Sequence, residues 1–165
     1  CPCGFFGDRS RPCRCTPQQI RQYQGRISGP LLDRIDIHIE VPSVRYRDLA
    51  GSEKGEPSAA VRKRIEGARA IQKTRFAGDE TLFNARMSDR QVRSACPIDE
   101  GSRQLIEMAV DRLGLSARAH SRILKVARTI ADLEGGGPLR SSHVAAAIQY
   151  RSLARRPVCR IPGRD

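Results

Sequence analysis

The sequence predicts a mainly α-helical protein in which a Cys-rich loop, a short helix and one strand precede an all-helical unit of about four to five helices. Two observations carry this prediction. From Ser58 onward, apolar residues recur three or four positions apart, which is the spacing of one helix face, and only residues 35–41 alternate strictly between apolar and polar. The 165 residues are enough for one ordinary domain or two small ones.

The first part, residues 1–41, is predicted to be largely irregular because it is rich in Cys, Pro and Gly. A short helix is expected from Thr16 to Gln24, with Thr16 as its N-cap and Pro17 as its first helical residue. The alternation in residues 35–41 predicts a strand, and Pro42 ends it. Residues 42–57, which contain Gly, Ser, Glu and Lys, are expected to form a linker.

The helical unit is predicted to span residues 58–153, and a basic, flexible tail is predicted for residues 154–165. The first predicted helix begins at Ser58, and the second has a Ser88 cap and ends ahead of Cys96-Pro97. The third begins near Ile98 and stops at Gly114, and the fourth begins near Ser116 and stops at residues 135–138. The last begins at a Ser141-Ser142 cap and ends at Tyr150 or Leu153. Cys96 is expected in the core at a helix end, and Cys159 in the tail.

The charge of +12 comes mostly from the second part of the chain. Nine basic and seven acidic residues precede Pro57, whereas 21 basic and 11 acidic residues follow from it, so the two parts carry +2 and +10. Such an excess favours an anionic partner such as nucleic acid or nucleotide phosphate. Of the cations 26 are Arg, a residue suited to phosphate, although a compositional bias of the source genome explains the same count.

The chain has neither a Gly-x4-Gly-Lys-Ser/Thr loop nor a Gly-x-Gly-x-x-Gly fingerprint, which excludes an independent nucleotide hydrolase. It also has no run of about 18 apolar residues and no signal-peptide pattern, so we expect a cytoplasmic protein without a membrane partner.

Four cysteines fall within the first fifteen residues, as Cys1-x-Cys3 and Cys13-x-Cys15. Four thiolates joined by turns at Gly4, Gly7 and Pro12 could close a tetrahedral Zn²⁺ site. Reduced structural thiols and a redox role remain open as alternatives, while disulfides are disfavoured in a reducing compartment.

Three segments resemble a known family. They are Cys-Pro-Cys-Gly at residues 1–4, Ser-Gly-Pro-Leu-Leu-Asp-Arg-Ile-Asp at residues 28–36, and the run that opens Gly-Leu-Ser-Ala-Arg-Ala-His-Ser-Arg at residues 114–133. Together these segments are similar to the magnesium-chelatase-like AAA+ ATPases of the ComM/YifB type, and the resemblance covers nearly all of residues 1–153.

The resemblance implies that residues 1–41 end an AAA+ α/β core and that residues 58–153 form its helical lid. It also implies a C-terminal fragment of a hexameric ring that hydrolyses ATP with Mg²⁺ while acting on DNA, as a branch-migration helicase of natural transformation. The partners would be the rest of its own chain, neighbouring subunits and DNA. The Walker A and Walker B residues would lie upstream of Cys1, so we expect this chain to be inactive alone.

Arg34 matches the family's arginine finger by position. A guanidinium at a helix end can reach a γ-phosphate held by a neighbouring subunit and stabilise the transition state in trans. The alternative from the residues alone is a surface ion pair with Asp33 or Asp36.

Arg118, Arg122 and Lys125 fall within about 60° of one another on a helical wheel, away from an apolar face that contains Ala119, Ile123, Val126, Ala127 and Ile130. Three stacked cations favour phosphate as a partner, although a solvated basic face is the alternative. Arg118 matches the family's sensor-2 arginine, and Arg122 and Lys125 are candidate assistants.

A second class of function fits the same residues. The chain could be a non-enzymatic adaptor, stabilised by zinc and binding DNA or protein through its basic surface.

Overall fold

The structure is a computed structural model that describes residues 1–8, 11–39, 41, 44, 55–79 and 83–151. Within these residues it contains α-helices and one 3-10 turn, and no strand. The elements are α1 (Pro17–Gln24), α2 (Gly29–Leu32), α4 (Ser58–Arg75), η1 (Asn84–Arg86), α5 (Asp89–Ala95), α6 (Glu100–Leu113), α7 (Ala117–Leu133) and α8 (Ser141–Gln149). None of the described helices combines the length and the apolar character needed to cross a bilayer.

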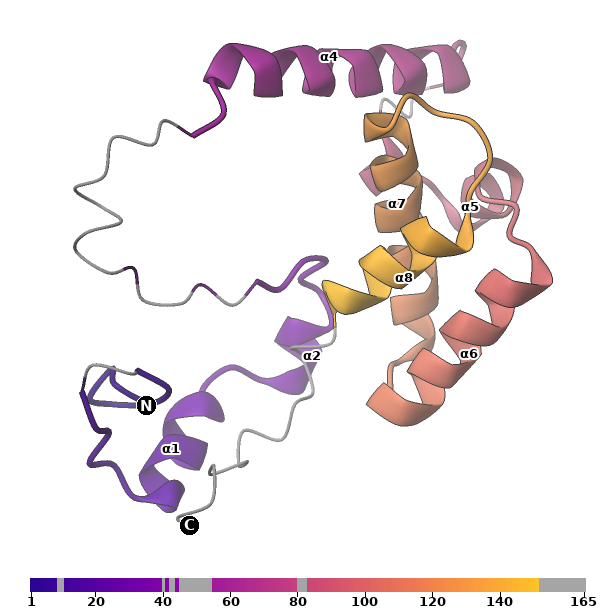
Figure 1. Cartoon of the computed structure of the whole chain (residues 1–165). Coiled ribbons are helices and arrows are strands. Elements are labelled where there is room, and N and C mark those ends of the chain that lie inside the picture. The colour runs from indigo at the N-terminus through magenta and orange to yellow at the C-terminus, as the bar shows by residue number, and fades with distance from the viewer. Residues whose placement is uncertain (9–10, 40, 42–43, 45–54, 80–82, 152–165) are drawn as a thin grey trace.

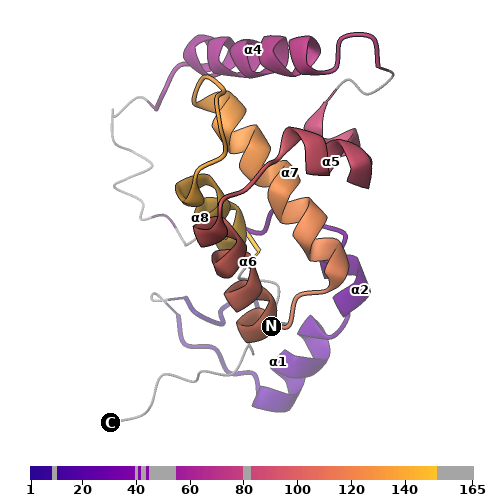
Figure 2. The same ribbon diagram turned by 90° about the vertical axis from the view of Figure 1, so that its right-hand side faces the viewer.

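Helix α7 is the central element of the helical unit. Helices α4, α5 and α8 pack against it, α6 packs against α8, and α4 crosses the C-terminal end of α7 (Figures 1 and 2). The predicted apolar face is confirmed, because Ala119, Ile123 and Ala127 are 0% exposed and Val126 and Ile130 pack against the same core. The small side chains of Ala119, Ala127 and Ala131 on this buried face allow neighbouring helices to pack closely against α7.

The N-terminal part lies at the opposite end from α4 (Figure 1). As predicted, α1 starts after Thr16, whose hydroxyl accepts from the Gln19 amide at 3.3 Å while the Gln19 side chain accepts from the Thr16 amide at 2.8 Å. This reciprocal pair satisfies two donors that a helix start otherwise leaves open. Among the α1 residues only Ile20 is buried.

The lid boundaries follow the sequence signals closely. Ser88 caps α5, and α6 ends at Gly114, whose φ of 55° places it in the left-handed region that glycine adopts without strain. The predicted cap of the last helix is wrong. Ser141 is the first residue of α8, not its cap, and the amide of Arg140 instead donates to Nδ1 of His143 at 3.1 Å.

The predicted strand at residues 35–41 is wrong for the described residues, because none of them is in a strand. Their apolar side chains are exposed, from 41% at Ile35 to 81% at Val41. An alternating segment becomes a strand only when another extended segment pairs with its backbone, and the described residues supply none. The helices α2 and η1 were not predicted, since both are too short to show a period.

Several predictions fall on residues that the structure does not describe. They are most of the linker at residues 42–57, the tail at residues 154–165 and, within it, Cys159.

A buried polar network joins α4, η1 and α7. The Arg75 guanidinium donates to both carboxylate oxygens of Asp132, at 2.5 and 2.7 Å, and Asn84 Nδ2 donates to the same carboxylate at 2.8 Å. Arg128 Nε also donates to Asp132 at 3.1 Å, and the Asp132 side chain is 0% exposed. The network therefore fixes the position of η1 and of the adjoining face of α7, which is the face that carries Arg118, Arg122 and Lys125.

Candidate functional site

A cleft of about 480 Å³ opens along the N-terminal half of α7. Its walls bring together the three predicted cations Arg118, Arg122 and Lys125. The other lining residues are Asp36 from the segment after α2, Ala85 from η1, Asp89 from α5, and Ser121 from α7. The three cations that the helical wheel predicted to share one face of α7 thus line a cleft.

The ionic and polar contacts in the cleft compensate its three cations unequally. Arg122 forms an ion pair with Asp36, and its Nη1 also donates to the Arg34 carbonyl at 2.8 Å. Lys125 Nζ donates to the Ala85 carbonyl at 3.2 Å. Arg118 is exposed and makes no hydrogen bond or ion pair within the described residues.

Asp89 accepts from the Ser121 hydroxyl at 3.1 Å and forms no ion pair within the described residues. Three cations therefore meet two carboxylates in the cleft, and one of those carboxylates is held by Arg122. An excess of positive charge in a concave, partly desolvated site favours an anionic ligand.

Arg34 lies two residues beyond the end of α2 and does not line the cleft. Ser28 caps this four-residue helix, and its hydroxyl accepts from the Leu31 amide at 3.4 Å. The Arg34 side chain is exposed, and its Nη1 donates to the Pro30 carbonyl at 2.8 Å. The surface ion pair with Asp33 or Asp36 that the sequence left open does not form in the described structure, since Asp36 pairs with Arg122 and lies 3.9 Å from Arg151.

Arg151 is a residue that the sequence did not single out. Its side chain is 0% exposed and donates to the carbonyls of Asp33 and Ile35, at 3.3 and 3.1 Å. No sequence signal marks it, because it stands at the predicted end of the last helix without a motif around it, and its partners lie 116 and 118 positions away.

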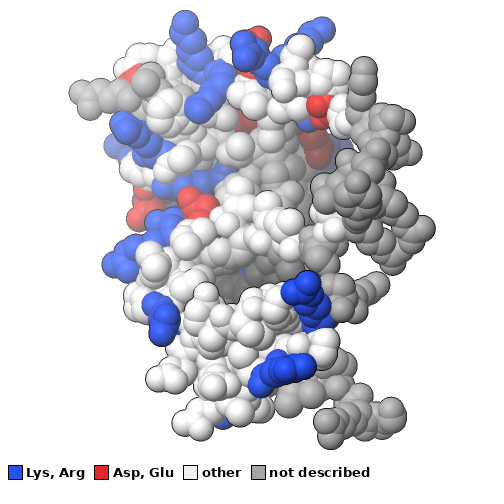
Figure 3. Space-filling view, turned by 90° about the vertical axis from the view of Figure 1, so that its left-hand side faces the viewer, with Lys and Arg blue, Asp and Glu red and all other residues white. Residues whose placement is uncertain are grey.

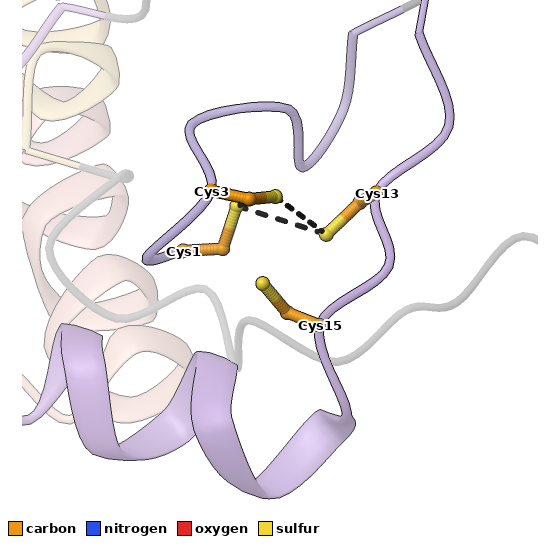
Figure 4. Close-up of side chains that lie close together, drawn as sticks. All are labelled: Cys1, Cys3, Cys13 and Cys15. Carbon is orange, nitrogen blue, oxygen red and sulfur yellow. Dashed lines mark hydrogen bonds between the residues drawn. The ribbon is translucent and has the colours of Figure 1, made fainter.

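The four N-terminal cysteines converge as predicted, and all four Sγ atoms lie within 4.8 Å of one another (Figure 4). Three of the pairs are 3.5 Å (Cys1–Cys3), 3.6 Å (Cys3–Cys13) and 3.7 Å (Cys1–Cys13), and all four thiols are free. A tetrahedral zinc site with Zn–S bonds of about 2.3 Å requires sulfurs about 3.8 Å apart. The cluster therefore has the donor set and the spacing of a structural zinc site.

Backbone amides favour thiolates in this cluster. The Phe6 amide donates to Cys1 Sγ at 3.2 Å. A hydrogen bond from the Phe5 amide is the main reason why the pKa of Cys3 falls to about 7, and hydrogen bonds from neighbouring thiols and the Arg14 amide lower it further. The pKa of Cys13 is raised, because burial and its thiol neighbours outweigh a hydrogen bond from the Cys15 amide. Thiols held this close cannot all ionise together without a cation between them.

Cys96, in contrast, is not part of a site. It is buried in the core at the end of α5, as predicted, and burial raises its pKa to about 11. A thiol in that state is inert at neutral pH.

Comparison with known proteins finds a family over most of the chain. Residues 55–151 match the family described as magnesium chelatase, subunit ChlI C-terminal, and residues 1–49 match the one described as magnesium chelatase, subunit ChlI. The competence protein ComM of Haemophilus influenzae is 42% identical over 143 residues, which are 86% of this chain and 27% of that protein.

Two proteins named YifB are similar over the same length. The one from Salmonella typhimurium is 39% identical and the one from Escherichia coli 37%, each over 86% of this chain and 28% of the relative. The chain thus spans less than a third of the length of these relatives.

Proposed function

Because this chain belongs to the magnesium chelatase ChlI family, we propose that it supplies the sensor-2 and arginine-finger parts of an AAA+ ATPase ring that acts on DNA. Arg118 takes the sensor-2 role and Arg34 the finger role. ATP and Mg²⁺ are cofactors of the whole protein in this proposal, since the 165 residues contain no Walker A loop.

The observation that carries the proposal is the convergence of Arg118, Arg122 and Lys125 on one cleft. A volume of about 480 Å³ accommodates a polyphosphate, and Arg118 lacks a compensating partner within the described residues. An arginine on a lid helix that contacts a γ-phosphate stabilises the charge that develops during phosphoryl transfer. Lys125 and Arg122 add charge at the same wall.

The exposure of Arg34 supports a role in trans. Its guanidinium has one hydrogen bond, to the Pro30 carbonyl of its own turn, and no ion pair within the described residues. A guanidinium in this state can exchange one exposed hydrogen bond for contacts to a phosphate of a neighbouring subunit. An arginine supplied in this way accelerates phosphoryl transfer by about 10³- to 10⁵-fold in GTPases.

DNA as the partner of the whole protein is supported by charge and by the relatives. Lysine and arginine side chains crowd the α4 end of the molecule (Figure 3), and α4 itself carries six of them against one glutamate. Phosphate neutralisation by such a surface drives sequence-independent binding. One relative is named a competence protein, so we place this chain in a motor for DNA branch migration during transformation, in the cytoplasm.

The test is ATP hydrolysis by the full-length protein. Arg34→Ala should lower kcat at least about 10³-fold while ATP binding is retained, because the finger acts only in the transition state. Arg118→Ala should weaken ATP binding, turnover or both. Arg112→Ala on the exposed side of α6 is the matched control and should behave as wild type. Unchanged hydrolysis in both the Arg34 and Arg118 variants would overturn the proposal.

The cysteine geometry favours a zinc site as a second element, and it also suits the adaptor function. The Sγ spacings of 3.5 to 3.7 Å fit a tetrahedral Zn²⁺, which would hold the first fifteen residues in their turns. About one equivalent of zinc is expected after purification under reducing conditions, and Cys13→Ser should reduce it. Less than a few tenths of an equivalent would exclude the site.

DNA binding by the 165-residue chain tests the adaptor function. Under that function the 165-residue chain binds duplex or branched DNA with a steep salt dependence, and Arg34→Ala in the full-length protein leaves ATP hydrolysis unchanged. No binding at about 50 mM salt would exclude the adaptor.

A further inference from the structure

The segment that carries Arg34 is bound to the lid through its backbone. We define the Arg34 segment as residues 33–38, which form no helix or strand. Three successive carbonyls, of Asp33, Arg34 and Ile35, each accept a hydrogen bond from a lid arginine, at 3.3, 2.8 and 3.1 Å. A fourth bond joins the His38 amide to the Tyr150 carbonyl at 2.8 Å. These bonds place a segment without secondary structure of its own.

Arg151 holds this segment from inside the protein. Its side chain is 0% exposed, and its two terminal nitrogens donate to the carbonyls on either side of Arg34. Burial lowers the pKa of Arg151, although the nearby Asp36 carboxylate opposes that shift, and a guanidinium remains protonated at any physiological pH. A planar, buried fork that binds two carbonyls fixes their relative position more tightly than a single flexible donor does.

Arg122 connects the same segment to the cleft. Its Nη1 donates to the Arg34 carbonyl and pairs with Asp36, while the residue also lines the cleft beside Arg118 and Lys125. One guanidinium is thus shared between the backbone of Arg34 and the proposed phosphate site. The Arg122 side chain thus provides a direct link of hydrogen bonds between α7 and the Arg34 carbonyl.

We propose that Arg151 and Arg122 are positioning residues that anchor the Arg34 segment to the lid and so couple Arg34 to the cleft that contains Arg118. This inference rests on the proposed function, in which Arg34 acts on one bound nucleotide and Arg118 on another. The anchor links the two sites within a single subunit. The Arg34 side chain does not contribute to this anchor, since its described hydrogen bond goes to the Pro30 carbonyl.

Limited trypsin digestion of the chain tests the anchor without any nucleotide. Trypsin cleaves after Arg34, and the bonds to three carbonyls restrain the unfolding that cleavage requires. Arg151→Lys and Arg122→Gln should each raise the cleavage rate after Arg34 by about tenfold, since a hydrogen bond to a charged group is lost. Cleavage after Arg26, outside the anchored segment, is the internal reference, and Arg112→Lys on α6 is the matched control.

The same variants in the full-length protein test the catalytic consequence. In Arg151→Lys a displaced finger should lower kcat while the KM for ATP is unchanged, whereas a general loss of structure also lowers the melting temperature and raises cleavage everywhere. Because Arg122 also lines the proposed phosphate site, Arg122→Gln should raise the KM for ATP as well, and its cleavage rate after Arg34 is the measurement that tests the anchor. Should Arg151→Lys fail to fold, Arg122→Gln decides, because the Arg122 side chain is 32% exposed and tolerates replacement.

The outcomes separate the two proposals. Unchanged cleavage after Arg34 in both variants overturns the anchor, whatever the ATPase activity. Faster cleavage with unchanged kcat overturns the coupling to catalysis. If Arg34→Ala leaves hydrolysis unchanged, the arginine-finger function fails and the coupling fails with it, while the digestion still decides whether the anchor exists.

Discussion

Replacing Asp132 with Asn should strongly destabilise the helical unit. The Asp132 carboxylate is 0% exposed and accepts hydrogen bonds from Arg75, Asn84 and Arg128. The amide of an asparagine would present a donor to three donors and would leave two guanidiniums without their counter-charge. The Arg75 and Arg128 side chains are only 18% and 5% exposed, so water cannot replace the lost partner.

The size of the effect follows from this burial. Removal of one partner from a buried ion pair costs about 3–5 kcal/mol, whereas an exposed pair contributes at most about 1 kcal/mol. For a helical unit of about 100 residues, a loss of about 3–5 kcal/mol lowers Tm by about 12 °C or more. Because the network joins α4 to α7, the loss should appear first as faster hydrogen exchange in α4.

Urea unfolding of Asp132→Asn, with exposed Asp111→Asn on α6 as the control, measures this free energy. The pH dependence gives a second, independent measurement. Burial alone would raise the pKa of Asp132, but hydrogen bonds from Arg75 and Asn84 lower it below its ordinary value. Its contribution to stability is therefore complete above the unfolded-state pKa near 4 and is lost as the pH falls through the lower folded-state value. A destabilisation below about 1 kcal/mol, or an acid limb unchanged in the variant, would refute the argument.

Three further predictions concern caps and thiols. Gly114→Ala should destabilise the fold by about 1 kcal/mol in urea unfolding, because the residue's φ is 55°, and Ser88→Ala should cost about the same through loss of the α5 cap. In metal-free protein at pH 8, Cys3, with a pKa of about 7, should be alkylated rapidly, whereas buried Cys96, with a pKa of about 11, should stay unmodified until the protein unfolds. Peptide mass mapping distinguishes these results, and labelling of Cys96 in the native protein would contradict the burial.

The sequence alone predicted what depends on local spacing. The apolar period of α7, the stop at Gly114 and the caps at Thr16 and Ser88 are local signals, and the structure confirms each of them. The wheel also placed the cleft cations on one face, since their angular positions depend only on the geometry of a helix. The four N-terminal cysteines are close in sequence, and tight turns bring them together.

The predictions that failed concern residues whose hydrogen-bonding partners lie far away in the sequence. Residues 35–41 have a strand pattern, yet a strand exists only through hydrogen bonds to another extended segment. The described long-range backbone bonds of this segment go instead to Arg151 and to the Tyr150 carbonyl. The Arg75–Asp132 network was invisible for the same reason, because its members are 57 positions apart.

Local chemistry in the sequence therefore determined the helices, their caps and which cations share a face. Only the tertiary structure decided that Arg34 is bound through its backbone, that Arg151 is buried, and that Arg122 serves both the cleft and the Arg34 segment. The physical reason is that helix period and capping act over about four residues, whereas burial and ion pairing depend on which distant residues the packed helices bring within hydrogen-bond distance.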